Sequence, residues 1–124
     1  MRKITIQVGD LLFEAELNDS EAAEQIAGAL PIKGSANVWG DEIYFDIPVQ
    51  MPEAPDARAD VEVGELAYWP PGSAFCIFYG PTPVSSSSQP RAYSPVNVVG
   101  RIRGDATLLR GVASGTAVSI LIAE

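Results

Sequence analysis

Apolar and polar residues alternate along the first part of the chain with the period of two that is typical of a half-buried β-strand. Apolar side chains occupy every second position in Ile4–Val8 and again in Leu11–Leu17. Gly9-Asp10 separates the two runs, and such a dipeptide favours a tight turn. The pattern therefore predicts a β-hairpin.

The period changes to that of a helix between Asn18 and Pro31, where five apolar residues share one helical face. Asn18 can cap this helix, Glu21 stands three residues further on, and Pro31 ends the run. A single short helical turn is predicted for Leu108–Arg110, with Asp105 as its cap. The sequence thus predicts one longer and one short helix.

Later segments return to strand patterns. The alternation in Ile43–Ile47 directs Ile43, Phe45 and Ile47 to the core and Tyr44 to the opposite face. Ala74–Tyr79 is apolar throughout, as in a central strand, and strands are also predicted in Val96–Ile102 and Thr116–Ala123. Roughly seven or eight short strands favour a closed barrel or a sandwich, because closure removes exposed strand edges.

Two proline-containing segments interrupt these strands. Gln50–Asp60 is predicted to be a mobile loop, and Gly80–Pro95, which holds four prolines and the serines Ser85–Ser88, is the longest loop. Binding residues concentrate on loops that a rigid scaffold positions. Gly80–Pro95 is therefore the segment in which we expect functional residues.

Length and charge limit the function classes. The 124 residues have the size of one compact domain, so a single domain over residues 1–124 is predicted. The formal charge of -8 disfavours nucleic acid and anionic membranes as partners. No run approaches the roughly 20 apolar residues of a membrane span, and the alternation after Met1-Arg2-Lys3 differs from a signal peptide, so we expect a cytoplasmic protein.

Candidate chemistry is sparse. The sequence contains no His, which removes the commonest general base and metal ligand and every Ser-His or Cys-His nucleophile. Its single cysteine, Cys76, lies in an apolar run and is interpreted as a buried small hydrophobe. Asp41, Glu42 and Asp46 are interpreted as a solvated acidic edge, so neither a metal nor another cofactor is expected.

Two segments resemble the cyclophilins. Gly64–Ala67 followed by Gly72–Ile77 resembles their Gly-x-Leu-Ser/Ala strand and the Gly-Ser-Gln-Phe-Phe-Ile stretch after it, and Val98–Gly104 with Leu108-Leu109 resembles their Val-Phe-Gly-x-Val-x-x-Gly strand and the short helix that follows. A wider match is similar to a small bacterial and archaeal group of cyclophilin-like proteins without an established function; it includes Trp39–Phe45, Ala67–Gly72 and Phe78–Pro83. The resemblance implies a mainly β fold, a closed eight-stranded antiparallel β-barrel.

The resemblance does not bring the isomerase site with it. A cyclophilin stabilises a twisted prolyl amide with an arginine, a glutamine and an aromatic pocket closed by a tryptophan and a histidine. Asp46 stands where the arginine is expected and Ala74 where the glutamine is expected, while Cys76 replaces the second aromatic residue and Val96 the histidine. No catalytic residue is therefore predicted, and any enzyme activity would most simply be prolyl isomerisation.

Aromatic residues beside the loops leave a binding role open. Some of them belong to the core, and one interpretation assigns all of them to it. The other interpretation is a shallow groove with a cationic anchor, lined by Tyr44, Trp69, Phe78, Tyr79, Arg91, Tyr93 and Arg101. The leading hypothesis is a barrel without the isomerase set that binds a small molecule or a peptide segment. The alternatives are an isomerase with a rearranged site and a structural subunit.

Overall fold

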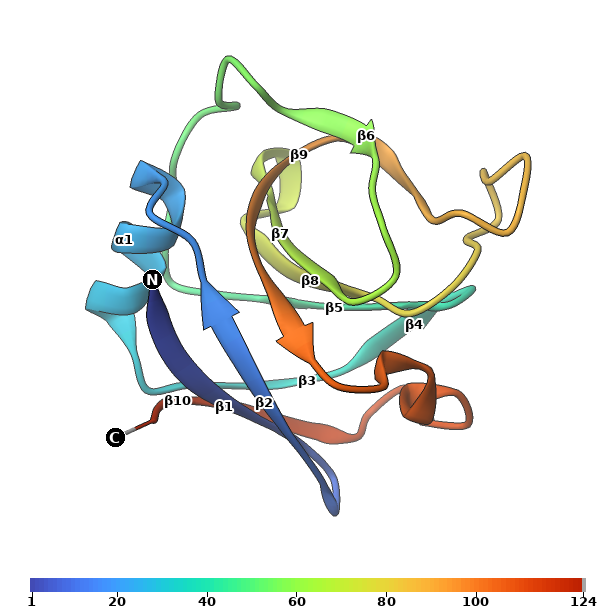
Figure 1. Ribbon diagram of the computed structural model, residues 1–124, viewed down its shortest axis with the longest axis horizontal. Helices are drawn as coiled ribbons and strands as arrows, with labels where there is room; N and C mark the ends of the chain where they lie inside the picture. Colours follow the sequence, from blue (N-terminus) through green and yellow to red (C-terminus); the bar gives the residue numbers. More distant parts are fainter. Residues whose placement is uncertain (124) are drawn as a thin grey trace.

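The computed structural model describes residues 1–123, which form ten strands, one α-helix and two 3-10 turns (Figure 1). The strands are β1 Arg2–Val8, β2 Leu11–Leu17, β3 Ile32–Ser35, β4 Asn37–Trp39, β5 Glu42–Asp46, β6 Arg58–Asp60, β7 Glu65–Trp69, β8 Ala74–Phe78, β9 Arg91–Arg103 and β10 Ala117–Ile122. The helix is α1 Glu21–Ala29, and the 3-10 turns are η1 Pro70–Gly72 and η2 Ala106–Leu109. None of the helices within residues 1–123 has the length and apolar character needed to cross a bilayer.

The strands form one antiparallel sheet in the order β3-β10-β1-β2-β9-β7-β8-β5-β4, and β6 pairs with β9 outside this order. The predicted hairpin is confirmed, since β1 pairs with β2 from Arg2 opposite Leu17 to Val8 opposite Leu11. The mainly β, antiparallel character is also confirmed. The strand count was too low, because the short strands β3, β4 and β6 carry no clear alternation in the sequence.

The prediction of a closed eight-stranded barrel is wrong, because the pairing order has two free ends, β3 and β4. These strands follow each other in the chain with only Ala36 between them, and the backbone changes its partner from β10 to β5 at this point. The sheet nevertheless curls round its own interior (Figure 1). Gly34 of β3 lies against the ring of Phe45 in β5, where an added Cβ would come within 2.7 Å of the ring. The seam between β3 and β5 therefore rests on side-chain contact.

Helix α1 packs its apolar face on the inside of the curled sheet. The predicted cap was displaced by two residues: Ser20 is the N-cap and its Oγ accepts from the backbone N–H of Ala23. Asn18 instead supports the cap, since its Oδ1 accepts from the backbone N–H of Ser20. The second predicted cap is confirmed, because the Asp105 carboxylate accepts from the N–H of Thr107 at the start of η2.

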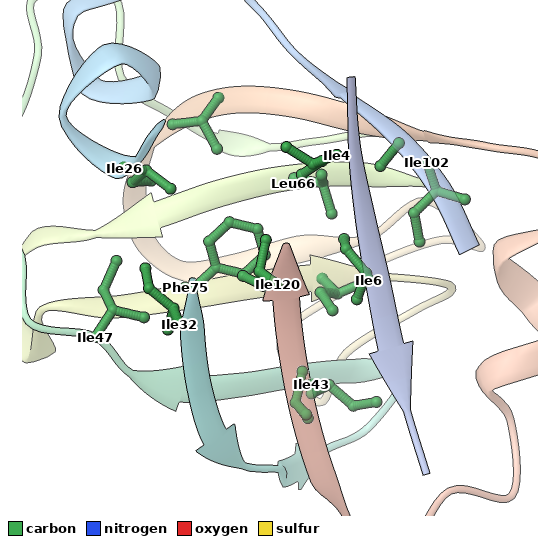
Figure 2. Close-up of a cluster of buried hydrophobic side chains, with 14 of the residues drawn as sticks. Ile4, Ile6, Ile26, Ile32, Ile43, Ile47, Leu66, Phe75, Ile102 and Ile120 are labelled. Atoms are coloured by element: carbon green, nitrogen blue, oxygen red, sulfur yellow. The ribbon is translucent and has the colours of Figure 1, made fainter. Parts of the chain in front are cut away.

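The inner core fills the space enclosed by the sheet and α1, and its side chains come from nearly every strand (Figure 2). Ile43 and Phe45 of β5 belong to it, as the alternation predicted, and the Phe45 ring packs on that of Phe75 with centroids 5.6 Å apart. Helix α1 adds Ile26, which is fully buried. The inner core holds the scaffold together.

A second apolar group, the outer cluster, covers the opposite face of β5, β7 and β8. Its buried members are Val61, Ala67, Cys76, Phe78, Ala92 and Val96. The first half of β9 and the segment after β6 supply three of these, so they lie over strands whose other face lines the inner core. Both faces of this part of the sheet are thus covered.

The segment between β5 and β7 is anchored more firmly than the predicted mobile loop. The buried side chain of Asn97 accepts from the backbone N–H of Ala54 at 2.7 Å and donates to the carbonyl of Pro52 at 3.1 Å. The Tyr68 hydroxyl donates to the carbonyl of Val49 at 2.8 Å. These buried hydrogen bonds fix the course of the loop, and β6 forms within it.

Candidate functional site

A pocket of about 220 Å³ opens at the edge of the outer cluster. Strands β4, β5, β7, β8 and β9 each contribute to its wall. The lining residues are Trp39, Glu42, Tyr44, Trp69, Cys76, Ala92, Tyr93 and Val96. Four aromatic rings and one carboxylic acid therefore surround a small volume.

The period of the strands places these side chains together. Glu42 and Tyr44 are two residues apart on β5 and so point to the same face, away from Ile43 and Phe45. Tyr44 stands opposite Cys76 on β8. The pocket is therefore built on the sheet face that the inner core does not use.

Tyr93 lies between the two tryptophans at the pocket's edge. Its ring meets Trp39 edge to face at a centroid distance of 6.1 Å, and Trp69 in the same way at 6.2 Å. The indole Nε1 of Trp69 donates to the Ser94 hydroxyl at 2.7 Å, which holds the indole in place. Tyr93 itself is 72% exposed, so it forms a rim.

Glu42 is the unusual residue of the site, because its side chain is a carboxylic acid and yet the residue is only 6% exposed. Its Oε1 atom is buried and has no hydrogen-bond partner among residues 1–123. Burial raises the pKa of Glu42 to about 7, and the neighbouring Cys76 thiol partly offsets this increase. The side chain thus changes its charge near neutral pH.

Cys76 is buried, as its apolar surroundings in the sequence predicted. Burial raises the pKa of its thiol well above the ordinary value, and the nearby Glu42 carboxylate adds to the effect. A thiol with a raised pKa carries little thiolate and is a poor nucleophile at neutral pH. Cys76 therefore serves as part of the pocket wall.

Of the seven residues predicted to line a groove, the structure brings three together at the pocket: Tyr44, Trp69 and Tyr93. Phe78 is fully buried in the outer cluster. Tyr79 belongs to the inner core, where burial, with the charges of Asp41 and Glu42, raises its pKa to about 12. These two aromatic rings support the scaffold.

The two predicted arginines lie outside the pocket wall. The guanidinium of Arg91 donates to the carboxylate of Asp60 at 2.9 Å, and that of Arg101 donates to Glu62 at 2.9 Å. Both side chains are exposed on the surface. Among the described residues that line the pocket, none carries a positive charge.

The sequence reasoning missed Trp39 as a groove residue and assigned Glu42 to a solvated edge. One signal was present: the strand at Ala74–Phe78 is apolar at every position, which means that both of its faces are covered. The cover extends to the start of β5, where Glu42 is buried, while Asp46 at the other end of the strand stays exposed. Within residues 1–123, no three acidic or cysteine side chains come together as metal ligands.

Two solved structures and one family model are similar to this chain. The solution structure of the hypothetical protein AF2241 from Archaeoglobus fulgidus is 41% identical, with a TM-score of 0.82 over 98% of this chain and 95% of that one. The structure of McbB in complex with tryptophan is 19% identical and has a TM-score of 0.73; the match covers 96% of this chain and 44% of McbB, and shows the fold alone. No functionally curated protein matches significantly. The family model described as "Cyclophilin-like" matches residues 2–121, and the chain therefore belongs to the cyclophilin-like family.

Proposed function

We propose that this protein binds a small organic molecule in the pocket between Tyr44, Trp69 and Tyr93. The observation that carries the proposal is the pocket itself, in which aromatic side chains from several strands surround one buried polar group. Small-molecule sites typically have this composition, because apolar walls supply affinity and a few polar groups supply orientation.

The size of the pocket limits the ligand. An engineered apolar cavity of about 150 Å³ accommodates benzene. A volume of about 220 Å³ therefore suits one six-membered ring with a short side chain. A long peptide would have to remain outside and insert only a single side chain, so a small molecule is the better fit.

The side chains of the pocket support binding over prolyl isomerisation. Cys76 and Val96, which align with the second aromatic residue and the histidine of the isomerases, both line the pocket. The expected cationic group is missing from the lining, since Asp46 takes its aligned position and Arg91 and Arg101 pair elsewhere. Without a cationic donor, the site lacks the electrostatic stabilisation that the isomerases' arginine gives to the carbonyl of a twisted amide.

McbB, of which 44% matches this chain, was solved in complex with tryptophan. That likeness concerns the fold, and the proposal for this chain rests on its own side chains.

Tryptophan fluorescence tests the proposal directly. The chain has two tryptophans, Trp39 and Trp69, and both line the pocket. Titration with 2-phenylethanol, a neutral ring with a short chain, should change their emission in a saturable way. A strictly linear response both to this alcohol and to its amine analogue, 2-phenylethylamine, would contradict the proposal.

A pair of variants locates the binding. Ala92→Phe places a ring into the pocket and should abolish the saturable signal. Ala117→Phe makes the same chemical change at an exposed position of β10 and should leave the signal unchanged. Equal binding by wild type and Ala92→Phe would place the ligand elsewhere.

A further inference from the structure

The buried acid at the pocket lacks a counter-charge. Among residues 1–123, Glu42 is one of four buried polar or charged residues, and its Oε1 makes no hydrogen bond within this part of the chain. Native proteins pair nearly all buried polar groups, because an unpaired one retains its full desolvation cost. An orphaned carboxylate oxygen at a pocket wall therefore points to a partner that arrives with the ligand.

The nearby cations are already engaged. Arg110 pairs with Asp41 at 3.2 Å, the residue next to Glu42 in the chain. Arg58 of β6, the strand that pairs with β9, contacts the carboxylate of Glu65 at 3.0 Å. The chain thus supplies no cation to the pocket lining described above, and the positive partner must come from outside.

The aromatic rings fit the same partner. A ring's π face is electron-rich and attracts a cation within about 6 Å of its centroid, most strongly in tryptophan. Trp39, Tyr44, Trp69 and Tyr93 together surround the space beside Glu42. A carboxylate next to several aromatic rings is the arrangement that recognises organic ammonium groups.

We propose that the pocket is a site for a small organic ammonium compound, with the Glu42 carboxylate as counter-ion and the aromatic side chains as the cage around it. The inference rests on the proposed function and narrows its ligand class to a cation with one ring or a comparable apolar group. The ammonium group donates up to three hydrogen bonds and can satisfy Oε1. An anionic ligand would face the carboxylate without compensation.

The test compares three probes that share a phenyl ring and a short chain: 2-phenylethylamine, 2-phenylethanol and 3-phenylpropanoate. Isothermal titration calorimetry is performed at pH 8, where an alkylammonium group keeps its proton. We expect the amine to bind at least about tenfold more tightly than the alcohol, a ratio worth about 1.4 kcal/mol, and the propanoate to bind most weakly.

Two charge-neutralising variants test whether the Glu42 carboxylate causes the preference for the amine over the alcohol. Glu42→Gln keeps the shape of the side chain and should reduce the preference for the amine by at least about tenfold. Asp46→Asn removes the same charge from the same face of β5 but at an exposed position outside the pocket lining, and it should retain the wild-type preference.

A measurement on the wild-type protein keeps the test decisive if Glu42→Gln fails to fold. The ¹³C resonance of the Glu42 side-chain carboxyl is followed against pH with and without each probe. Saturating amine should lower the pKa of Glu42, because a bound cation favours the charged form, and the alcohol should not lower it.

The outcomes separate the two proposals. Equal binding of amine and alcohol in the pocket would overturn the ammonium assignment and leave the proposed function standing. An amine preference that survives Glu42→Gln, or an unchanged pKa of Glu42 with amine bound, would also overturn the assignment. Failure of both amine and alcohol to bind would overturn the proposed function together with it.

Discussion

The inner core and the outer cluster are built on the same strands and yet differ in how completely they are filled. On β5, Phe45 points inward and packs on Phe75, while Tyr44 points outward and borders an open pocket. The residues of the inner core are apolar apart from the hydroxyls of Tyr68 and Tyr79, whereas the outer face contains the buried acid Glu42. Because alternate residues of a strand point to opposite faces, the side chains that stabilise the fold lie on one face and those that border the pocket lie on the other.

The cost of a substitution in free energy of unfolding therefore depends on which face of the sheet it alters. A side chain truncated in the inner core leaves a cavity inside a close-packed structure. A side chain truncated at the pocket enlarges a space that already exists.

Phe45→Ala should cost about 3 to 5 kcal/mol of the free energy of unfolding, because the ring is only 1% exposed and lies between Phe75 and Gly34. Urea denaturation followed by circular dichroism measures this loss. A cost below about 1 kcal/mol would mean that the inward face of β5 carries little of the stability.

The ionisation of Glu42 with rising pH should have the next largest effect on the free energy of unfolding. The pKa of Glu42 is about 7 in the folded protein and near its ordinary value of 4.5 in the unfolded chain. The folded state therefore binds more protons between these values, and stability falls as pH rises from about 4.5 through about 7. The difference corresponds to roughly 3 kcal/mol, present below pH 4.5 and lost above the folded pKa.

Glu42→Gln provides the control for this pH dependence, because glutamine stays neutral. The variant should resemble wild type at pH 4.5 and exceed it in stability at pH 8, where wild type carries a buried charge. Urea denaturation of both proteins at the two pH values measures the difference. Parallel pH profiles would show that Glu42 is not the titrating group.

Tyr44→Ala should cost about 1 kcal/mol of stability and at the same time weaken binding of 2-phenylethanol by at least about tenfold. The ring is half-buried and borders the pocket, so its removal deletes ligand contacts without opening a cavity in the inner core. Denaturation and the fluorescence titration are compared on the same preparation. A stability loss as large as that of Phe45→Ala would erase the distinction between the two faces.

Arg91→Ala should have the smallest effect. The Arg91–Asp60 pair is solvent-exposed, and such pairs contribute about 0.5 kcal/mol or less. Because Arg91 lies outside the pocket lining, binding of 2-phenylethanol should stay within about twofold of wild type. A tenfold loss of affinity for 2-phenylethanol would instead support the role of Arg91 as the cationic anchor that the sequence suggested.

Much of the scaffold could be predicted from local pattern. The alternation in Leu11–Leu17 and in Ile43–Ile47 fixes which side chains face inward, and the structure places them there. The apolar run at Ala74–Phe78 correctly indicated a central strand with neighbours on both sides. These features depend on residues close together in the chain, so the sequence expresses them directly.

The pocket could be predicted only in part, because it depends on distant segments. Glu42 shares the pocket wall with Val96 and other residues of β9, some fifty positions further on in the sequence. An isolated glutamate on the polar face of a strand has the pattern of a solvated residue. The open ends of the sheet escaped prediction for a similar reason, since partner exchange at Ala36 leaves no local signal.

The seam between β3 and β5 lacks the ladder hydrogen bonds that would join the two strands in a closed barrel. Pairing ends at β3 and β4, and the packing of the Phe45 ring on Gly34 holds β3 against β5 in place of hydrogen bonds. We expect the slow breathing of the molecule to concentrate along this line. Strand β5 borders this line and carries Glu42 and Tyr44 of the ligand site on its other face.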